Sequence, residues 1–168
     1  VLLSFPGTMA ASRLSAAAKL LDEPTPANGP LAAADALGRT AAETCRQHER
    51  LSRLHDLGVS TAELAAAHAL VDTIDLALAE CVKDFEKCCA KAPASDDADV
   101  RQRANSLWLA AREYLRRHSI AEKASQQLTQ HDAEKLGVLK FEYELEASAL
   151  LALRQATVAL GKLRPEAK

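Results

Sequence analysis

The chain has 168 residues and a formal net charge of −2, and its composition is dominated by 35 Ala and 26 Leu, whereas only 4% of residues are aromatic. Seven Val and two Ile are too few for a β-rich domain, because sheets depend on branched and aromatic side chains. The near-zero net charge offers no positive field to hold a polyanion, so we expect no nucleic-acid partner.

Residues 1–30 are predicted to form a short helix, about Thr8 to Leu21, and a proline-rich linker. The segment 22–30 contains three prolines, which cannot continue a helix. The apolar start lacks a basic region and is interrupted at Pro6 and Gly7, which argues against a secretory signal or a membrane span. A transit peptide is the alternative for this segment, since the first 21 residues contain two basic residues and no acid.

Four long helices are predicted in the remaining chain, which we take as one domain over 31–168. Their apolar residues recur with alternating spacings of three and four, the pattern of helices that pack knobs-into-holes. We expect no transmembrane segment and see no internal repeat. The sequence therefore predicts an all-α fold, an antiparallel up-down four-helix bundle with coiled-coil-like seams. The predicted helices are 31–57, 61–91, 97–128 and 132–163.

The turn between the first two helices is the best marked. Gly58 occupies a position that suits a residue with positive φ after a helix end. Ser60-Thr-Ala-Glu63 matches a capping box, in which the serine and glutamate satisfy each other's backbone N–H groups. Pro93 and the acidic residues up to Asp99 mark the next boundary.

The third turn is less well marked. The apolar seam of the third helix ends at Leu128, and Asp132 is a plausible cap for the fourth helix, so we place the turn near residues 126–131. The alternative is a turn at Ser119–Glu122, which also fits a capping pattern. The fourth helix has the following predicted core seam: Leu136, Leu139, Tyr143, Glu146, Leu150, Leu153, Thr157 and Leu160.

Polar residues interrupt the apolar seams at similar depths. Counted from the turns, His48, His118 and Glu146 fall within about 8 Å of one another along the bundle axis, with Asp75 beside them. Imidazole and carboxylate groups at one level could bind Zn or Fe. The alternative is a hydrogen-bonded polar layer that fixes the register of the helices, with no cofactor.

The cysteines and arginines have simpler interpretations. Cys81 and Cys88 lie two turns apart on one seam, too far to be bridged, and are expected to be buried small side chains in a reducing compartment. The arginines of 101–117 are expected to pair with acids on neighbouring helices; the alternative is a patch for an acidic partner or a phosphate. Trp108 is expected to widen the core.

No phosphate-binding loop, nucleophile elbow, zinc-protease motif or paired CxxC occurs. We therefore expect a non-enzymatic, cytoplasmic interaction or assembly module whose partner is a protein or a second copy, forming a homo-oligomer. The alternative is a metal- or ligand-binding bundle that uses His48, His118 and Glu146, with Asp75. A thiol-based redox sensor and a membrane-surface coat remain as further alternatives.

Overall fold

The computed structural model describes residues 30–91, 98–128 and 132–161. These residues form four α-helices and no strand, so the prediction of an all-α fold is confirmed. The expected N-terminal helix and linker lie outside the described residues. The side chain of Cys89 is not described either. In the helices described, no segment is long and apolar enough to cross a membrane.

The helices begin and end within two residues of the predicted positions. They are α2 (Pro30–Asp56), α3 (Thr61–Lys91), α4 (Ala98–Gln126) and α5 (Ala133–Gly161). Each has between 27 and 31 residues, which corresponds to a length of about 40 to 46 Å.

The turn after α2 has the predicted chemistry. Gly58 has a φ of 62°, its N–H donates to the His55 carbonyl at 3.1 Å, and the Val59 N–H donates to the Leu54 carbonyl at 3.4 Å. These two bonds form a Schellman motif, which satisfies the last carbonyls of α2. The Ser60 N–H donates to Glu63 Oε2 at 3.0 Å, and the Glu63 N–H donates to Ser60 Oγ at 3.3 Å, so the capping box is also present.

The turn after α4 lies where the seam predicts it. Ser119 and Glu122 are inside α4, so the alternative turn at these residues is wrong. Asp132 caps α5, because its Oδ1 accepts the Lys135 N–H at 3.2 Å. The same contact holds the pKa of Asp132 below its usual value, with a further contribution from the Lys135 side chain.

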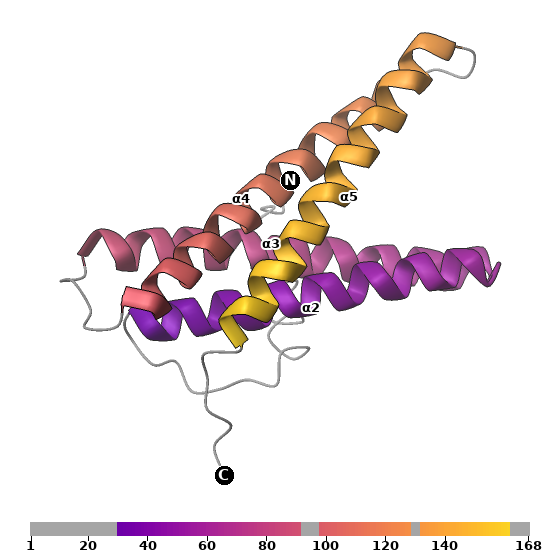
Figure 1. The fold of residues 1–168 in the computed structure, drawn as a ribbon. Coiled ribbons are helices and arrows are strands. Elements are labelled where there is room, and N and C mark those ends of the chain that lie inside the picture. The colour runs from indigo at the N-terminus through magenta and orange to yellow at the C-terminus, as the bar shows by residue number, and fades with distance from the viewer. Residues whose placement is uncertain (1–29, 92–97, 129–131, 162–168) are drawn as a thin grey trace, which may run out of the picture. The chain divides into compact units, whose positions relative to one another are not determined.

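The contacts divide the chain into two compact units, with the boundary between Ala90 and Lys91. The first unit contains α2 and α3, and the second contains α4 and α5 (Figure 1). In the first, Thr40 contacts Cys81 and His48 contacts Asp75, which makes the pair antiparallel. We name this antiparallel pair the first hairpin.

The second unit is also an antiparallel pair, in which α4 and α5 run side by side (Figure 1). Arg103 near the start of α4 donates to the Ala159 carbonyl near the end of α5, and His118 contacts Glu146. We name this pair the second hairpin. The next helix in sequence is thus the packing partner within each unit, as the up-down prediction requires.

Residues with the predicted spacings of three and four are buried in α2, α3 and α4. They are Ala34, Leu37 and Ala41 in α2, Val71, Ile74 and Leu78 in α3, and Ala104, Leu107, Ala111 and Tyr114 in α4. The largest fully buried side chains are Tyr114, Leu37, Ile74, Leu78, Leu107 and Leu153. The seam predicted for α5 is partly wrong, because Leu136 is 57% exposed and Tyr143 is 48% exposed, whereas Ala149 is buried. The physical reason is that α5 is apolar on several sides and has the weakest segregation of polar and apolar residues among the four helices, so more than one stripe fits the spacing.

Candidate functional site

The first hairpin contains two of the four predicted site residues, and they form a polar pair. His48 Nε2 of α2 lies 3.3 Å from Asp75 Oδ2 of α3. Both side chains are shielded, with 15% of the imidazole and 7% of the carboxylate exposed. Closer to the turn, His55 and His68 pack edge to face, with ring centroids 6.3 Å apart. The polar pair therefore bridges α2 and α3 within their packed interface.

The second hairpin contains the other two predicted site residues, which form a pair with a shorter contact. His118 Nδ1 of α4 lies 2.6 Å from Glu146 Oε1 of α5. The imidazole N–H donates to the carboxylate, and a hydrogen bond to a charged group is stronger than a neutral one. The ring of Tyr114, which is fully buried, stacks against the imidazole at a centroid separation of 6.0 Å. The imidazole is thus oriented by contacts on two sides.

All four predicted site residues therefore lie in cross-helix pairs, one pair in each hairpin. Among the described residues there is no group of three or more His, Cys, Asp or Glu side chains placed to hold a metal ion. A structural zinc site generally requires four protein ligands and a catalytic site three. Neither pair forms such a set by itself, and each acts as a polar contact that links two helices. Metal binding by the four residues stays a prediction.

The two hairpins share a residue pattern that the sequence alone did not bring out. The His–acid pairs align α2 with α4 at an offset of 70 residues, and this alignment gives identical residues at six positions. They are Ala34/Ala104, Leu37/Leu107, Ala41/Ala111, Glu43/Glu113, Arg46/Arg116 and His48/His118. These six are among the 27 positions of α2, so α2 and α4 share a few residues on the turns around and before the two histidines.

The repeated glutamate makes the same contacts in both hairpins. Glu43 accepts hydrogen bonds from Arg46 and Gln47 on the following turn of α2. Burial alone would raise the pKa of Glu43, but the hydrogen bonds from Gln47 and Arg46 outweigh this effect and lower it. Glu113 accepts three hydrogen bonds from Arg116 and Arg117, which hold its pKa at about 2. Arg116 and Arg117 therefore pair with an acid of their own helix, where an acid on a neighbouring helix was expected.

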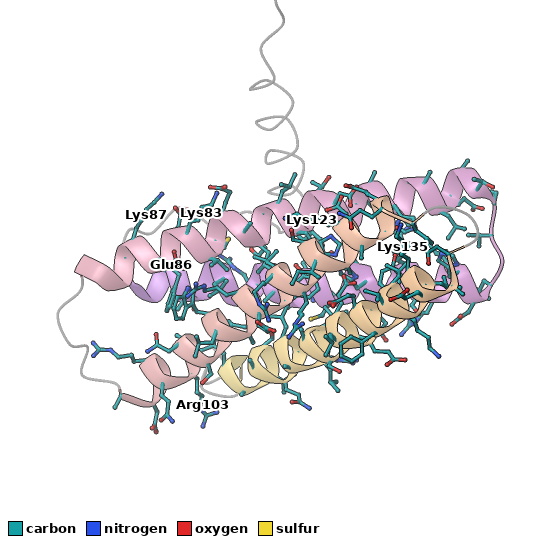
Figure 2. The ribbon with its side chains drawn as sticks, turned by 90° about the horizontal axis from the view of Figure 1, so that it is seen from above. Lys83, Glu86, Lys87, Arg103, Lys123 and Lys135 are labelled. Atoms are coloured by element: carbon teal, nitrogen blue, oxygen red, sulfur yellow. The ribbon has the colours of Figure 1, made fainter. Side chains whose placement is uncertain are left out.

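The helices α3 and α5 carry different exposed residues. The alignment of Asp75 with Glu146 relates α3 to α5 at an offset of 71 residues. At this offset Asp72, Glu80 and Lys87 of α3 correspond to the following residues of α5: Tyr143, Leu151 and Val158. Figure 2 shows Lys87 directed away from the α3 ribbon. The exposed surface of α3 thus includes charged side chains, and that of α5 includes large apolar ones.

We name the α5 stripe after the exposed residues Leu136, Tyr143, Ala147, Leu151 and Val158. The four large side chains are each between 48% and 57% exposed. At 100° per residue the five positions fall within an arc of about 80° on the helix. Six of the nine exposed large hydrophobic residues in the described chain belong to α5, so exposed apolar surface is concentrated on this helix.

A shallow groove of about 510 Å³ lies beside one half of the stripe, within the second hairpin. Leu151, Val158 and Ala159 form its apolar part. The Arg103 guanidinium, labelled in Figure 2, borders the groove and donates to the Ala159 carbonyl at 2.8 Å. Arg154 is exposed on the same border. The groove therefore combines an apolar lining with two cationic groups.

Other predicted features take structural roles. The Arg112 guanidinium lies 4.8 Å from the centroid of the Trp108 ring, a cation–π contact on α4. Arg117 Nη1 lies 3.9 Å from Glu142 Oε2 of α5, the acid on a neighbouring helix that was expected. Cys45, Cys81 and Cys88 form no disulfide. Burial raises the pKa of the Cys81 thiol, although its contact with Thr40 opposes the shift, so this thiol is a poor nucleophile at neutral pH.

Comparison with protein-family models, with curated proteins and with solved structures gives no match for this chain. The function is therefore argued from the residues above. The four polar residues could be recognised from their positions on or beside the seams, but their division into two His–acid pairs could not. The α5 stripe was missed, because Leu136 and Tyr143 were assigned to the core.

Proposed function

We propose that this protein is a non-enzymatic assembly module that self-associates through the exposed face of α5. The observation that carries the proposal is the α5 stripe, whose four large apolar side chains are each between 48% and 57% exposed. Several large apolar side chains exposed along one side of a helix commonly mark an interaction surface, and here they share that side with Lys140 and Arg154. A cytoplasmic location is part of the proposal, because the described cysteines form no disulfide.

The form of the stripe supports a helix as the partner. Its large residues are spaced by seven, eight and seven positions, so they extend along more than 30 Å of α5 at 1.5 Å per residue. Apolar residues at such spacings pack against another helix with the same pattern. Each copy of the chain carries one such helix, so a second copy supplies a matching surface.

The experiment measures the oligomeric state of the full chain by sedimentation velocity over a range of concentrations. We expect the wild-type chain to form a dimer or a higher oligomer. Leu151→Glu should raise the dissociation constant by about tenfold or more, because it buries a charge at the interface. Leu151 is 56% exposed, so the substitution leaves the core of the hairpin intact.

The matched control is Leu76→Glu. Leu76 is exposed on α3 and corresponds to Ala147 at the offset of 71 residues, so it tests the equivalent face of the first hairpin. Association should be unchanged in this variant, and circular dichroism should show the same helix content in all three proteins. A wild-type chain that stays monomeric at every concentration, or equal weakening by both variants, would contradict the proposal.

A further inference from the structure

The turn end of the first hairpin carries two histidines that meet across its helices. His55 lies in the last turn of α2, and His68 lies about two turns into α3. Their ring centroids are 6.3 Å apart and the ring planes are inclined at 85°. Both residues are exposed. Two imidazoles from different helices therefore lie side by side where a dissolved ion can reach them.

These two imidazoles differ from the other described ones in what they contact. His48 and His118 each contact a carboxylate of the neighbouring helix. Within the described residues, no hydrogen bond or ion pair involves the ring of His55 or His68, and each ring contacts the other. A neutral imidazole nitrogen is a favoured ligand of divalent transition metals. The pair is thus free to bind an external ion without breaking a contact with an acid.

The turn between the helices holds the two histidines close together. The His55 carbonyl accepts the Gly58 N–H at 3.1 Å, so His55 is part of the Schellman motif that ends α2. The capping box at Ser60 and Glu63 fixes the start of α3. Because both backbones are already ordered, an ion bound to one imidazole meets the second at a high effective concentration.

The spacing of the rings suits one shared ion after a small movement of the side chains. With metal–nitrogen distances of about 2.0 to 2.1 Å and a tetrahedral angle, two imidazoles on one ion have centroids roughly 5 Å apart. The observed separation of the centroids is 6.3 Å. The rings therefore need to approach by about 1 Å, which rotation of exposed side chains supplies without a movement of the backbone.

We propose that His55 and His68 together bind one divalent transition-metal ion of the class that favours imidazole, with water in its remaining coordination positions. A closed structural site has four protein ligands, so two ligands hold an exchangeable ion. A bound ion links α2 to α3 and stabilises the first hairpin while it is present. The inference does not depend on self-association, because α5 belongs to the other hairpin.

The test is calorimetric titration of the full chain with Ni²⁺ alone. Ni²⁺ is the probe because thiolates select softer ions such as Cu⁺ and Zn²⁺, so the native cysteines contribute less to the signal. We expect one ion per chain. His55→Ala and His68→Ala should each weaken binding by about tenfold or more, because the ion keeps a single imidazole. Binding should also weaken as the pH is lowered, since protons compete for the ring nitrogens.

The matched control is His118→Ala, which removes an imidazole but leaves His55 and His68 in place. Its affinity for Ni²⁺ should equal that of the wild type, which separates this site from the metal site predicted at the His–acid pairs. Ni²⁺ is paramagnetic, so in proton spectra it should broaden the ring signals of His55 and His68 before those of the other three histidines.

Three results would overturn the proposal. They are a wild-type chain that binds no Ni²⁺, alanine variants of His55 and His68 that bind it as tightly as the wild type, and equal weakening by His118→Ala. Circular dichroism should show the same helix content in all variants, because both substituted residues of the pair are exposed. A chain that is monomeric in sedimentation would contradict self-association and leave the expected Ni²⁺ binding unchanged.

Discussion

At Gly58 the backbone conformation, and not the available space, limits which residues can replace the glycine. Its φ is 62°, and a Cβ atom added there would meet no other atom within 4 Å. Gly137 in α5 has equally open surroundings but no positive φ. The two glycines therefore differ only in the conformational cost of a side chain.

We predict opposite effects of alanine at these two positions. Gly58→Ala should lower the free energy of unfolding by about 1 kcal/mol, because L-residues are strained at positive φ. Gly137→Ala should raise it by about 0.5 to 1 kcal/mol, since alanine favours a helix over glycine. Urea denaturation followed by circular dichroism measures both. Equal effects of the two substitutions would mean that the φ of Gly58 does not control this turn.

Glu113 predicts a pH dependence of stability. Its pKa is held at about 2 by hydrogen bonds from Arg116 and Arg117, below the ordinary value of 4.5. A depressed pKa gives stability that is present above the ordinary value and is lost as pH falls toward the folded value. Because the carboxylate is 45% exposed, solvent screening limits the contribution to about 0.5 kcal/mol.

The measurement compares unfolding of the wild type and Glu113→Gln between pH 7 and pH 2. The wild type should be more stable by a constant amount down to about pH 5, and the difference should disappear as the pH approaches 2. Glu122→Gln controls for the removal of a carboxylate elsewhere on α4, since Glu122 is exposed and contacts Gln126 at 3.5 Å. A difference that persists at pH 2 would mean that the charge of Glu113 is not its cause.

At the scale of the helices, the His–acid pairs are the polar links between antiparallel neighbours. The contact of His118 with Glu146 is shorter than that of His48 with Asp75, 2.6 Å against 3.3 Å. A hydrogen bond to a charged group contributes about 1.5 to 3 kcal/mol when it is well formed. The second hairpin should therefore depend more strongly on its pair than the first.

A double-mutant cycle tests this difference. Alanine substitutions of His118 and Glu146 should show a coupling energy of about 1.5 kcal/mol, and those of His48 and Asp75 about half as much. Pairing His118→Ala with Glu144→Ala, which lies two residues from the bonded acid, should give a coupling near zero. A larger coupling for the first hairpin than for the second would contradict the distances.

The helices themselves were predictable because their signals are local. Gly58, the capping box at Ser60 and Asp132 act through neighbouring backbone groups, so their roles can be deduced from adjacent residues. The face of α5 was not predictable in the same way. A helix that is apolar on several sides gives no preferred direction, and only contacts with α4 show that Leu139 and Leu153 are inside while Leu136 and Tyr143 are outside.

The candidate site was partly predictable for a related reason. The depth of each polar residue along its helix follows from counting back to the turns, which placed His48, His118 and Glu146 at one level with Asp75 beside them. Which carboxylate each imidazole contacts depends on the direction of side chains around the helix, and axial depth does not specify this. The correspondence between the hairpins also needed the contacts, because it rests on a few identities in an alanine-rich background.

For the whole molecule, the predicted metal site has a direct test. Elemental analysis of the purified full chain, after dialysis against buffer containing Zn or Fe, measures the bound metal per chain. If the His–carboxylate layer binds metal, we expect about one ion per chain, and His118→Ala should abolish this binding. Glu144→Ala serves as the control for removal of a nearby side chain. Absence of stoichiometric metal from the wild type would leave the four residues as structural contacts.

The pairing of consecutive helices also has a consequence for the rate of folding. The His–acid contacts of the two hairpins join residues only 27 and 28 positions apart in the chain. Closing so short a loop costs little chain entropy, and domains dominated by such local contacts fold in microseconds to milliseconds. Each hairpin can therefore begin to close on the ribosome once its second helix emerges, because its closure does not depend on residues far away in the chain.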